Sequence, residues 1–228
     1  MYKKNVSLGL LLVLILIYFS ASFLYDYKLA VYVKLLIIPS FCLFVYFERK
    51  QKLPKKYLLF VLFFYLGDTA LIFMDILPFL YKTSMFFYLL SYLCIINLAY
   101  PFVKSLNLLN EIRIYELIIF SLIISVLVFV LNVIFELETN LFLNIIIVLN
   151  AVSAILLMIV SFLYLKEMFD NKSINFFLGA FCIFFSDVIS ALNFYYLEDF
   201  KLNFLERIMH FLGFYFIYLF SINKPVKE

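Results

Sequence analysis

Residues 141–165 read LFLNIIIVLNAVSAILLMIVSFLYL, an uninterrupted run of 25 residues without a charged side chain. A membrane-spanning helix needs roughly 20 mainly apolar residues, because about 30 Å of hydrocarbon is crossed at 1.5 Å per residue. The stretch therefore predicts a transmembrane helix.

Apolar runs of similar length fill most of the remaining sequence. Of the 228 residues, 67% are apolar and 14% are charged, and the mean hydropathy is +1.10. A soluble domain of this size cannot bury so much apolar surface. Because the breaks between runs are short, we predict a single transmembrane domain over residues 1–228, an all-α polytopic bundle of eight helices. The other seven predicted spans are 6–25, 29–47, 57–77, 85–103, 114–135, 174–197 and 204–222.

The first predicted span has an alternative interpretation. Lys3 and Lys4, the apolar run after them and the small residues 20–22 resemble a cleavable signal peptide. The apolar run continues to Tyr25 and so reaches spanning length, which favours a retained helix. Cleavage would leave seven helices.

Basic residues are distributed unequally between the two sets of predicted loops. Thirteen lie on the side of the termini, against three on the other side, which are Lys28, Lys82 and Lys201. This is a positive-inside pattern and predicts cytoplasmic termini in the inner (cytoplasmic) membrane of the cell. The thirteen are Lys3, Lys4, Arg49, Lys50, Lys52, Lys55, Lys56, Lys104, Arg113, Lys166, Lys172, Lys224 and Lys227.

Few ionisable residues fall inside the predicted spans, and each needs an explanation. Insertion of one costs roughly 2.5–3.5 kcal/mol, so each requires a partner, a cavity or a function. With the predicted orientation, all of them can meet in one cavity at the midplane or nearer the outer face. They are Lys34, Asp68, Asp75, Asp187, Glu206, Arg207 and His210.

Helical spacing places some of these residues on common faces. Asp68 and Asp75 are seven residues apart, and Glu206 and His210 are four apart. Small residues stand beside both deep carboxylates, Gly67 before Asp68 and Ser186 before Asp187, which would permit close helix approach and leave room for a ligand.

Purely structural interpretations compete with a functional one. Asp68 and Asp187 can pair with Lys34 and Arg207 as ion pairs that stabilise the bundle. Asp75 and Glu206 lie close enough to the predicted outer ends to be interfacial. His210 can be a hydrogen-bonded packing residue.

The sequence also argues against several kinds of site and partner. Cys42, Cys94 and Cys182 fall inside spans and behave as small apolar residues. With a single His and no nearby Cys, a metal site is not expected, and no cofactor motif is present. The net charge of +3 is spread over short loops, so no nucleic-acid partner is predicted. The predicted partner is a membrane lipid.

Three segments resemble the YhhN family, also called the TMEM86 or lysoplasmalogenase family, of eight-helix membrane proteins. Residues 34–39 (KLLIIP) are similar to its Lys- and Pro-containing opening, and residues 66–71 (LGDTAL) to its Gly-Asp-x-x-Leu motif. The most specific match is residues 179–194 (GAFCIFFSDVISALNF), similar to its Gly-Ala-x-x-Phe-x-x-Ser-Asp-x-x-x-Ala signature. Order and spacing agree across most of the chain. The family commonly has a His where Tyr92 aligns and a Gln where Tyr218 aligns.

The resemblance implies an ether hydrolase that cleaves the vinyl ether bond of a lysoplasmalogen into a fatty aldehyde and a glycerophospho-base. This reaction needs one protonated acid and one carboxylate, and we expect Asp68 and Asp187 to supply them, with the individual roles open. Lys34 and Arg207 are expected to hold the substrate phosphate or tune the pair. The expected substrate-binding residues are Lys34, Asp75, Tyr92, Asn193, Arg207 and His210.

Two other functions fit the same residues. Intramembrane Asp, Lys and Arg side chains are also typical of a small transporter or proton-coupled carrier, although Gly, which broken helices often contain, is scarce at four residues. The differences at Tyr92 and Tyr218 also allow a non-catalytic, lipid-binding member of the family.

Overall fold

The computed structural model describes residues 2–24, 27–49, 53–74, 76–104, 114–137, 140–194 and 200–222. Within these ranges the protein contains eight helices and no strand, so the all-α prediction is confirmed. The helices are α1 (Tyr2–Phe23), α2 (Tyr27–Arg49), α3 (Lys55–Ile72), α4 (Phe79–Val103), α5 (Ile114–Leu137), α6 (Leu141–Met168), α7 (Asn171–Leu192) and α8 (Phe200–Ile222).

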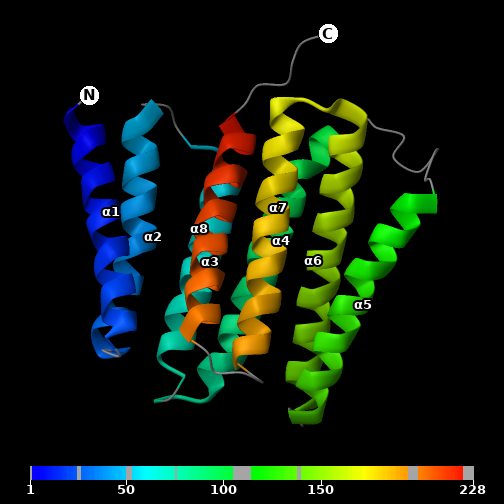
Figure 1. Cartoon of the computed structure of the whole chain (residues 1–228), viewed down its shortest axis with the longest axis horizontal. Coiled ribbons are helices and arrows are strands. Elements are labelled where there is room, and N and C mark those ends of the chain that lie inside the picture. Colours follow the sequence, from blue (N-terminus) through cyan, green and yellow to red (C-terminus); the bar gives the residue numbers. More distant parts are fainter. Residues whose placement is uncertain are drawn as a thin grey trace.

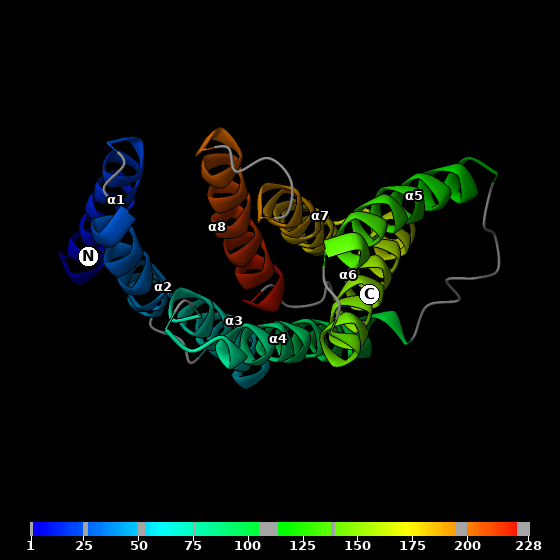
Figure 2. The same cartoon turned by 90° about the horizontal axis from the view of Figure 1, so that it is seen from below.

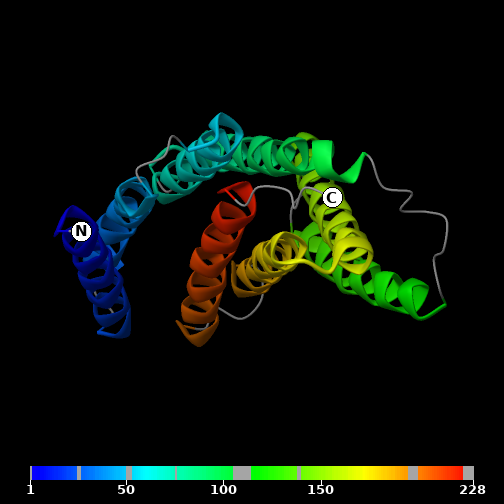
Figure 3. The same ribbon diagram turned by 90° about the horizontal axis from the view of Figure 1, so that it is seen from above.

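The helices are arranged as an arc around a central pair. Seen from either end, α1, α2, α3 and α4 follow one another along the arc, and α6 continues it beside α4 (Figures 2 and 3). Helices α7 and α8 lie inside the arc, and α5 packs outside against α6 and α7. The start of α1 and the end of α8 lie at the same end of the bundle (Figure 1).

Four of the described helices, α4, α6, α7 and α8, are long and apolar enough to cross a membrane. Many large apolar side chains on the outer surfaces are exposed, for example Leu16 on α1 and Leu122 and Phe129 on α5. Water-soluble proteins rarely expose contiguous apolar patches of this kind. These features suggest a membrane protein.

A tight turn joins α6 to α7 and makes them antiparallel neighbours. Phe169 ends α6 in the left-handed conformation, with φ of 38°. Asp170 then caps α7, because its Oδ1 accepts a 2.7 Å hydrogen bond from Ser173 N, while Ser173 Oγ accepts one of 2.9 Å from Asp170 N. This reciprocal capping satisfies backbone donors that a helix start leaves open.

Small residues allow α7 and α8 to pack closely. A Cβ on Gly179 would lie 2.7 Å from Ile217 Cδ1, and one on Gly213 would lie 2.7 Å from Ile183 Cγ1. Farther along, Ser186 Oγ donates a 2.9 Å hydrogen bond to the backbone oxygen of Glu206. The close contact places the polar residues of α8, Glu206, Arg207 and His210, beside Asp187 of α7.

Candidate functional site

Ionisable and phenolic side chains from five helices meet in the half of the bundle opposite the start of α1 and the end of α8. The group, called here the polar cluster, consists of Lys34 (α2), Asp68 (α3), Tyr88 and Tyr92 (α4), Ser186 and Asp187 (α7), and Glu206, Arg207 and His210 (α8). Lys34 and Arg207 each lie seven residues from the start of their helix, about 10 Å at 1.5 Å per residue.

Asp68 has two cations and a hydrogen-bond donor against its carboxyl group. Lys34 Nζ lies 3.5 Å from Oδ1, and Arg207 Nη1 lies 3.4 Å from Oδ2. The Tyr88 hydroxyl donates a 2.8 Å hydrogen bond to Oδ1. Only 6% of this side chain is exposed. The ion-pair interpretation is therefore correct for Asp68.

Glu206 is buried, with 2% exposure, so the interpretation of this residue as interfacial is wrong. It lies near the start of α8, but on the face that packs against α7. Its Oε2 lies 2.9 Å from Arg207 Nε, and its Oε1 lies 2.8 Å from His210 Nδ1. The four-residue spacing of Glu206 and His210 therefore produces a contact inside the bundle.

The hydrogen bonds around His210 define which ring nitrogen carries a proton. Nδ1 lies 2.8 Å from a carboxylate oxygen of Glu206 and 2.7 Å from Ser186 Oγ. The Ser186 hydroxyl already donates to the backbone oxygen of Glu206, so both neighbours of Nδ1 are acceptors. Nδ1 is therefore the donor, and Nε2 is left facing Oδ1 of Asp187 at 3.6 Å. His210 is also packed, with Phe64 at 4.5 Å between ring centroids.

Asp187 differs from Asp68 in both its partners and its exposure. The Tyr92 hydroxyl donates a hydrogen bond to Oδ2, and Oδ1 faces His210. No described cation from Lys or Arg forms an ion pair with it. Its side chain is 39% exposed, against 6% for Asp68.

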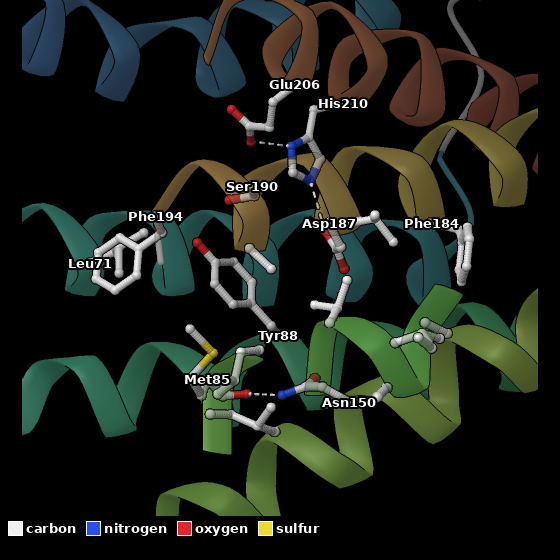
Figure 4. Close-up of a pocket in the computed structure, with 18 of the residues that line it drawn as sticks. Leu71, Met85, Tyr88, Asn150, Phe184, Asp187, Ser190, Phe194, Glu206 and His210 are labelled. Carbon is white, nitrogen blue, oxygen red and sulfur yellow. Dashed lines mark hydrogen bonds and ion pairs between the residues drawn. The ribbon is translucent and has the colours of Figure 1, made fainter. Parts of the chain in front are cut away.

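The exposed part of Asp187 faces a cavity of about 160 Å³. Its polar wall is formed by the side chains of Asp68, Tyr88, Asp187, Ser190, Glu206, Arg207 and His210. Helices α5 and α6 form the opposite wall, which is apolar except for Asn150. Figure 4 shows Asp187 between His210 on α8 and Asn150 on α6. A cavity of about this volume accommodates a benzene-sized group.

The polar cluster is one proton short of neutrality. It contains two cations, Lys34 and Arg207, and three carboxyl groups. A buried uncompensated charge costs several kcal/mol. One additional proton, on Asp187 or on the adjacent His210, makes the cluster neutral.

The structure brings together most of the residues that the sequence singled out. The cavity is lined by four of them, Asp68, Asp187, Arg207 and His210. Two others do not line the cavity but contact its aspartates: Lys34 contacts Asp68, and Tyr92 contacts Asp187. Asn193, at the end of α7, does not line it. Asp75 lies outside the described residues.

Sequence reasoning missed Tyr88 and Asn150. The four-residue spacing of Tyr88 and Tyr92 on one face of α4 was the available signal for the first. For Asn150, the signal was an amide inside the apolar run 141–165, where Asn144 is the other one.

Because Gly67 has no side chain, the Tyr88 ring of α4 packs directly against the backbone of α3. The expected close helix approach is confirmed at this position. A Cβ at this position would lie 2.7 Å from Tyr88 Cε1 and 2.9 Å from Cδ1. Phe64 packs on the same ring at 5.1 Å between centroids, and the hydroxyl is bound to Asp68. The ring therefore has little freedom to move.

We expect Gly67→Ala to destabilise the protein, because the methyl group displaces Tyr88 from Asp68. Overpacking costs about 1–3 kcal/mol, which exceeds the gain of up to about 1 kcal/mol in helix propensity. In a Tyr88→Ala background the same substitution should be neutral or stabilising. Thermal unfolding of the four proteins in detergent measures this, and an equal effect of Gly67→Ala in both backgrounds would contradict it.

Comparisons with family models, with curated proteins and with solved structures give no match for this chain.

Proposed function

We propose that the protein is a membrane hydrolase that cleaves the vinyl ether bond of a single-chain ether phospholipid, with Asp187 as the acid. The observation that supports this most is the position of Asp187. It is the most exposed of the three carboxyl groups that line the cavity, and it lies beside the hydrogen-bonded pair His210 and Glu206.

The proposal includes eight transmembrane helices with both chain ends in the cytoplasm. Among the described side chains, five lysines lie at the end of the bundle where α1 begins: Lys55, Lys56, Lys104, Lys166 and Lys172. Lys82 and Lys201 lie at the other end. The excess of basic residues at the first end supports a cytoplasmic location for it. The cavity then lies in the outer half of the bilayer.

The cluster suits the first step of vinyl ether hydrolysis. Asp187 gives a proton to the alkene carbon that does not bear the oxygen, which produces an oxocarbenium ion. Water attacks the oxygen-bearing carbon, and the carboxylate of Asp187 takes the proton that this water releases. Asp187 then gives this proton to the glycerol oxygen, and the carbon–oxygen bond of the hemiacetal breaks. The hemiacetal hydroxyl loses its proton to Asp187, which restores the acid, and the products are a fatty aldehyde and a glycerophospho-base.

His210 and Glu206 have positioning roles in this scheme. Glu206 accepts the Nδ1 proton of His210, so Nε2 faces Oδ1 of Asp187 at 3.6 Å without a proton of its own. Tyr92 fixes the other oxygen of Asp187 by its hydrogen bond. A carboxyl group whose orientation is fixed by a hydrogen bond is pre-organised for proton transfer.

Asp68 has a different role in the proposal from that of Asp187. Because two cations and Tyr88 surround it, we assign it to keeping Lys34 and Arg207 in place and balancing their charge. Since Lys34 and Arg207 already contact carboxylates, their proposed function is to adjust the charge of the cluster rather than to hold a phosphate.

The cavity dimensions agree with a substrate that enters sideways from the lipid. A volume of about 160 Å³ holds the reacting ether and its neighbouring carbons, but not a whole lipid. Leu127, Val130 and Ile134 of α5 would contact the first part of the alkenyl chain, because they form the apolar wall.

The direct test is aldehyde release from lysoplasmenyl-ethanolamine by the purified protein in detergent or vesicles. We expect aldehyde and glycerophosphoethanolamine in equal amounts. The saturated alkyl ether analogue is the control and should be inert, because it has no alkene carbon to protonate. Absence of aldehyde under conditions where the protein is folded would refute the hydrolase, and flux of protons or solutes in proteoliposomes would favour a carrier.

A further inference from the structure

Two aromatic rings meet at one limit of the cavity, at the end of the bundle opposite the start of α1. Tyr81, in the first turn of α4, and Phe194, just beyond the end of α7, both line the cavity. Their ring centroids lie 5.7 Å apart and the ring planes differ by 13°, so the two rings are stacked. Figure 4 shows Phe194 beside Leu71 at one side of the cavity and Phe184 at the opposite side. The stacked pair therefore bridges α4 and α7 at this limit.

The cavity extends along one face of α7 to the stacked pair. Asp187, Ser190 and Phe194 follow one another at spacings of three and four residues, and all three line the cavity. Seven residues separate Asp187 from Phe194, which is about 10 Å at 1.5 Å per residue. The pair thus lies between the proposed acid and the end of the bundle where α4 begins.

In the opposite direction, aromatic side chains fill the space behind His210. The ring of Phe64 lies 4.5 Å from that of His210, Phe214 lies 4.8 Å from Phe64, and Phe60 lies 5.2 Å from Phe214, measured between centroids. Each of the three phenylalanines is at most 5% exposed. These described side chains close the way along α3 and α8 from the end of the bundle where α1 begins.

Phe194 is held less firmly than these buried rings. It is 46% exposed and lies beyond the last residue of α7. Exposed side chains change rotamer within picoseconds to nanoseconds, and a stacked aromatic pair adds only a small free energy to the contact. The two rings can therefore separate without movement of a helix.

We propose that Tyr81 and Phe194 form a gate that admits water and small polar solutes to the cavity from the end of the bundle where α4 begins. The gate is closed while the rings are stacked and opens when Phe194 turns away from Tyr81. It does not rest on the proposed hydrolysis. In that reaction, however, it supplies the water that is consumed and lets the polar product leave, while the alkenyl chain enters from the lipid.

The test measures how fast a thiol inside the cavity reacts with a water-soluble reagent. Alanine first replaces the three native cysteines, none of which lines the cavity: Cys42, Cys94 and Cys182. Ser190→Cys then supplies the thiol, one helical turn deeper than Phe194. The full chain in detergent is treated with a charged methanethiosulfonate, and modification is followed by intact mass. Both Phe194→Ala and Tyr81→Ala should make modification about three- to tenfold faster, because loss of the stacked contact raises the open fraction.

Phe87→Ala is the matched control. Phe87 lies on α4, as Tyr81 does, and stacks on Phe63 of α3 at 6.3 Å and 19°, but neither ring of this pair lines the cavity. Its loss should leave the rate unchanged. Tyr81→Phe keeps the ring and should also keep the slow rate. Leucine at positions 81 and 194 provides the same comparison if alanine prevents folding.

Three results would overturn the inference. They are an unchanged rate in the variants of both Tyr81 and Phe194, an equal increase in Phe87→Ala, or a rate in Tyr81→Phe as fast as in Tyr81→Ala. The last would mean that the hydroxyl, rather than the stacked ring, limits access. Thiol modification needs no lipid substrate, so failure of the hydrolase proposal is seen separately, as a lack of aldehyde release by the wild type.

Discussion

Replacement of Asp187 by Asn is expected to lower the rate of aldehyde release from lysoplasmenyl-ethanolamine by about 10²–10⁴-fold, the usual contribution of a general acid. Asn has the size of Asp and can still contact Tyr92 and His210, but its amide cannot give a proton to carbon. The measurement is the initial rate at saturating lipid, and the loss should fall on kcat rather than on KM.

Asp170→Asn is the matched control for this variant. It changes the Asp that caps the same helix, and Asn caps a helix as well as Asp does. It should release aldehyde at the wild-type rate. The assignment of Asp187 fails if Asp187→Asn keeps its rate within tenfold of the wild type, or if both variants lose activity equally.

The second large effect is expected at Asp68. Asp68→Asn should destabilise the protein, and a second substitution, Lys34→Met, should restore much of the stability. Asp68→Asn leaves Lys34 without its carboxylate, and breaking a buried ion pair costs about 3–5 kcal/mol. At roughly 2–4 °C per kcal/mol for a chain of this length, the melting temperature should fall by roughly 6–20 °C. Adding Lys34→Met removes the cation that has lost its ion-pair partner and should restore much of this loss.

The same pair of substitutions should affect activity through the charge of the cluster. Asp68→Asn alone leaves two cations and two carboxyl groups, so the cluster no longer needs the additional proton, and aldehyde release should fall. In Lys34→Met/Asp68→Asn one cation faces two carboxyl groups, and the additional proton is required again. Aldehyde release should therefore recover with stability.

Two comparisons make this prediction specific. Lys34→Met should not correct Asp187→Asn, because Lys34 pairs with Asp68. If the double variant at Lys34 and Asp68 is folded but remains inactive, Asp68 takes part in the chemistry itself, as the original expectation of an acid and base pair has it.

Helix existence was predictable from apolar runs, but helix ends were less so. The span predicted at 141–165 is α6, which runs to Met168. The span predicted to start at Met85 starts at Phe79, directly after Pro78. Lys82, Thr83 and Ser84 fall between the predicted spans 57–77 and 85–103 and so on the loop side of the predicted boundary. Within α4, however, the hydroxyls of Thr83 and Ser84 donate to the backbone oxygens of Phe79 and Tyr81, so these residues fit a helix.

The sequence by itself determined that this protein is a set of apolar helices with a short list of ionisable residues inside them. Both follow from the cost of placing polar groups away from water, which depends on composition and run length and is independent of how helices meet.

Only the tertiary structure decided which of those residues meet. Helices such as α3 and α6 are apolar on every side, so their sequences do not reveal which face is turned inward. The packing of α8 on α7 buried Glu206 behind His210, and the packing of α3 on α4 enclosed Asp68 with Tyr88. As a result Asp187 faces the cavity, because rigid contacts between helices, rather than spacing along any one of them, set the distances between side chains.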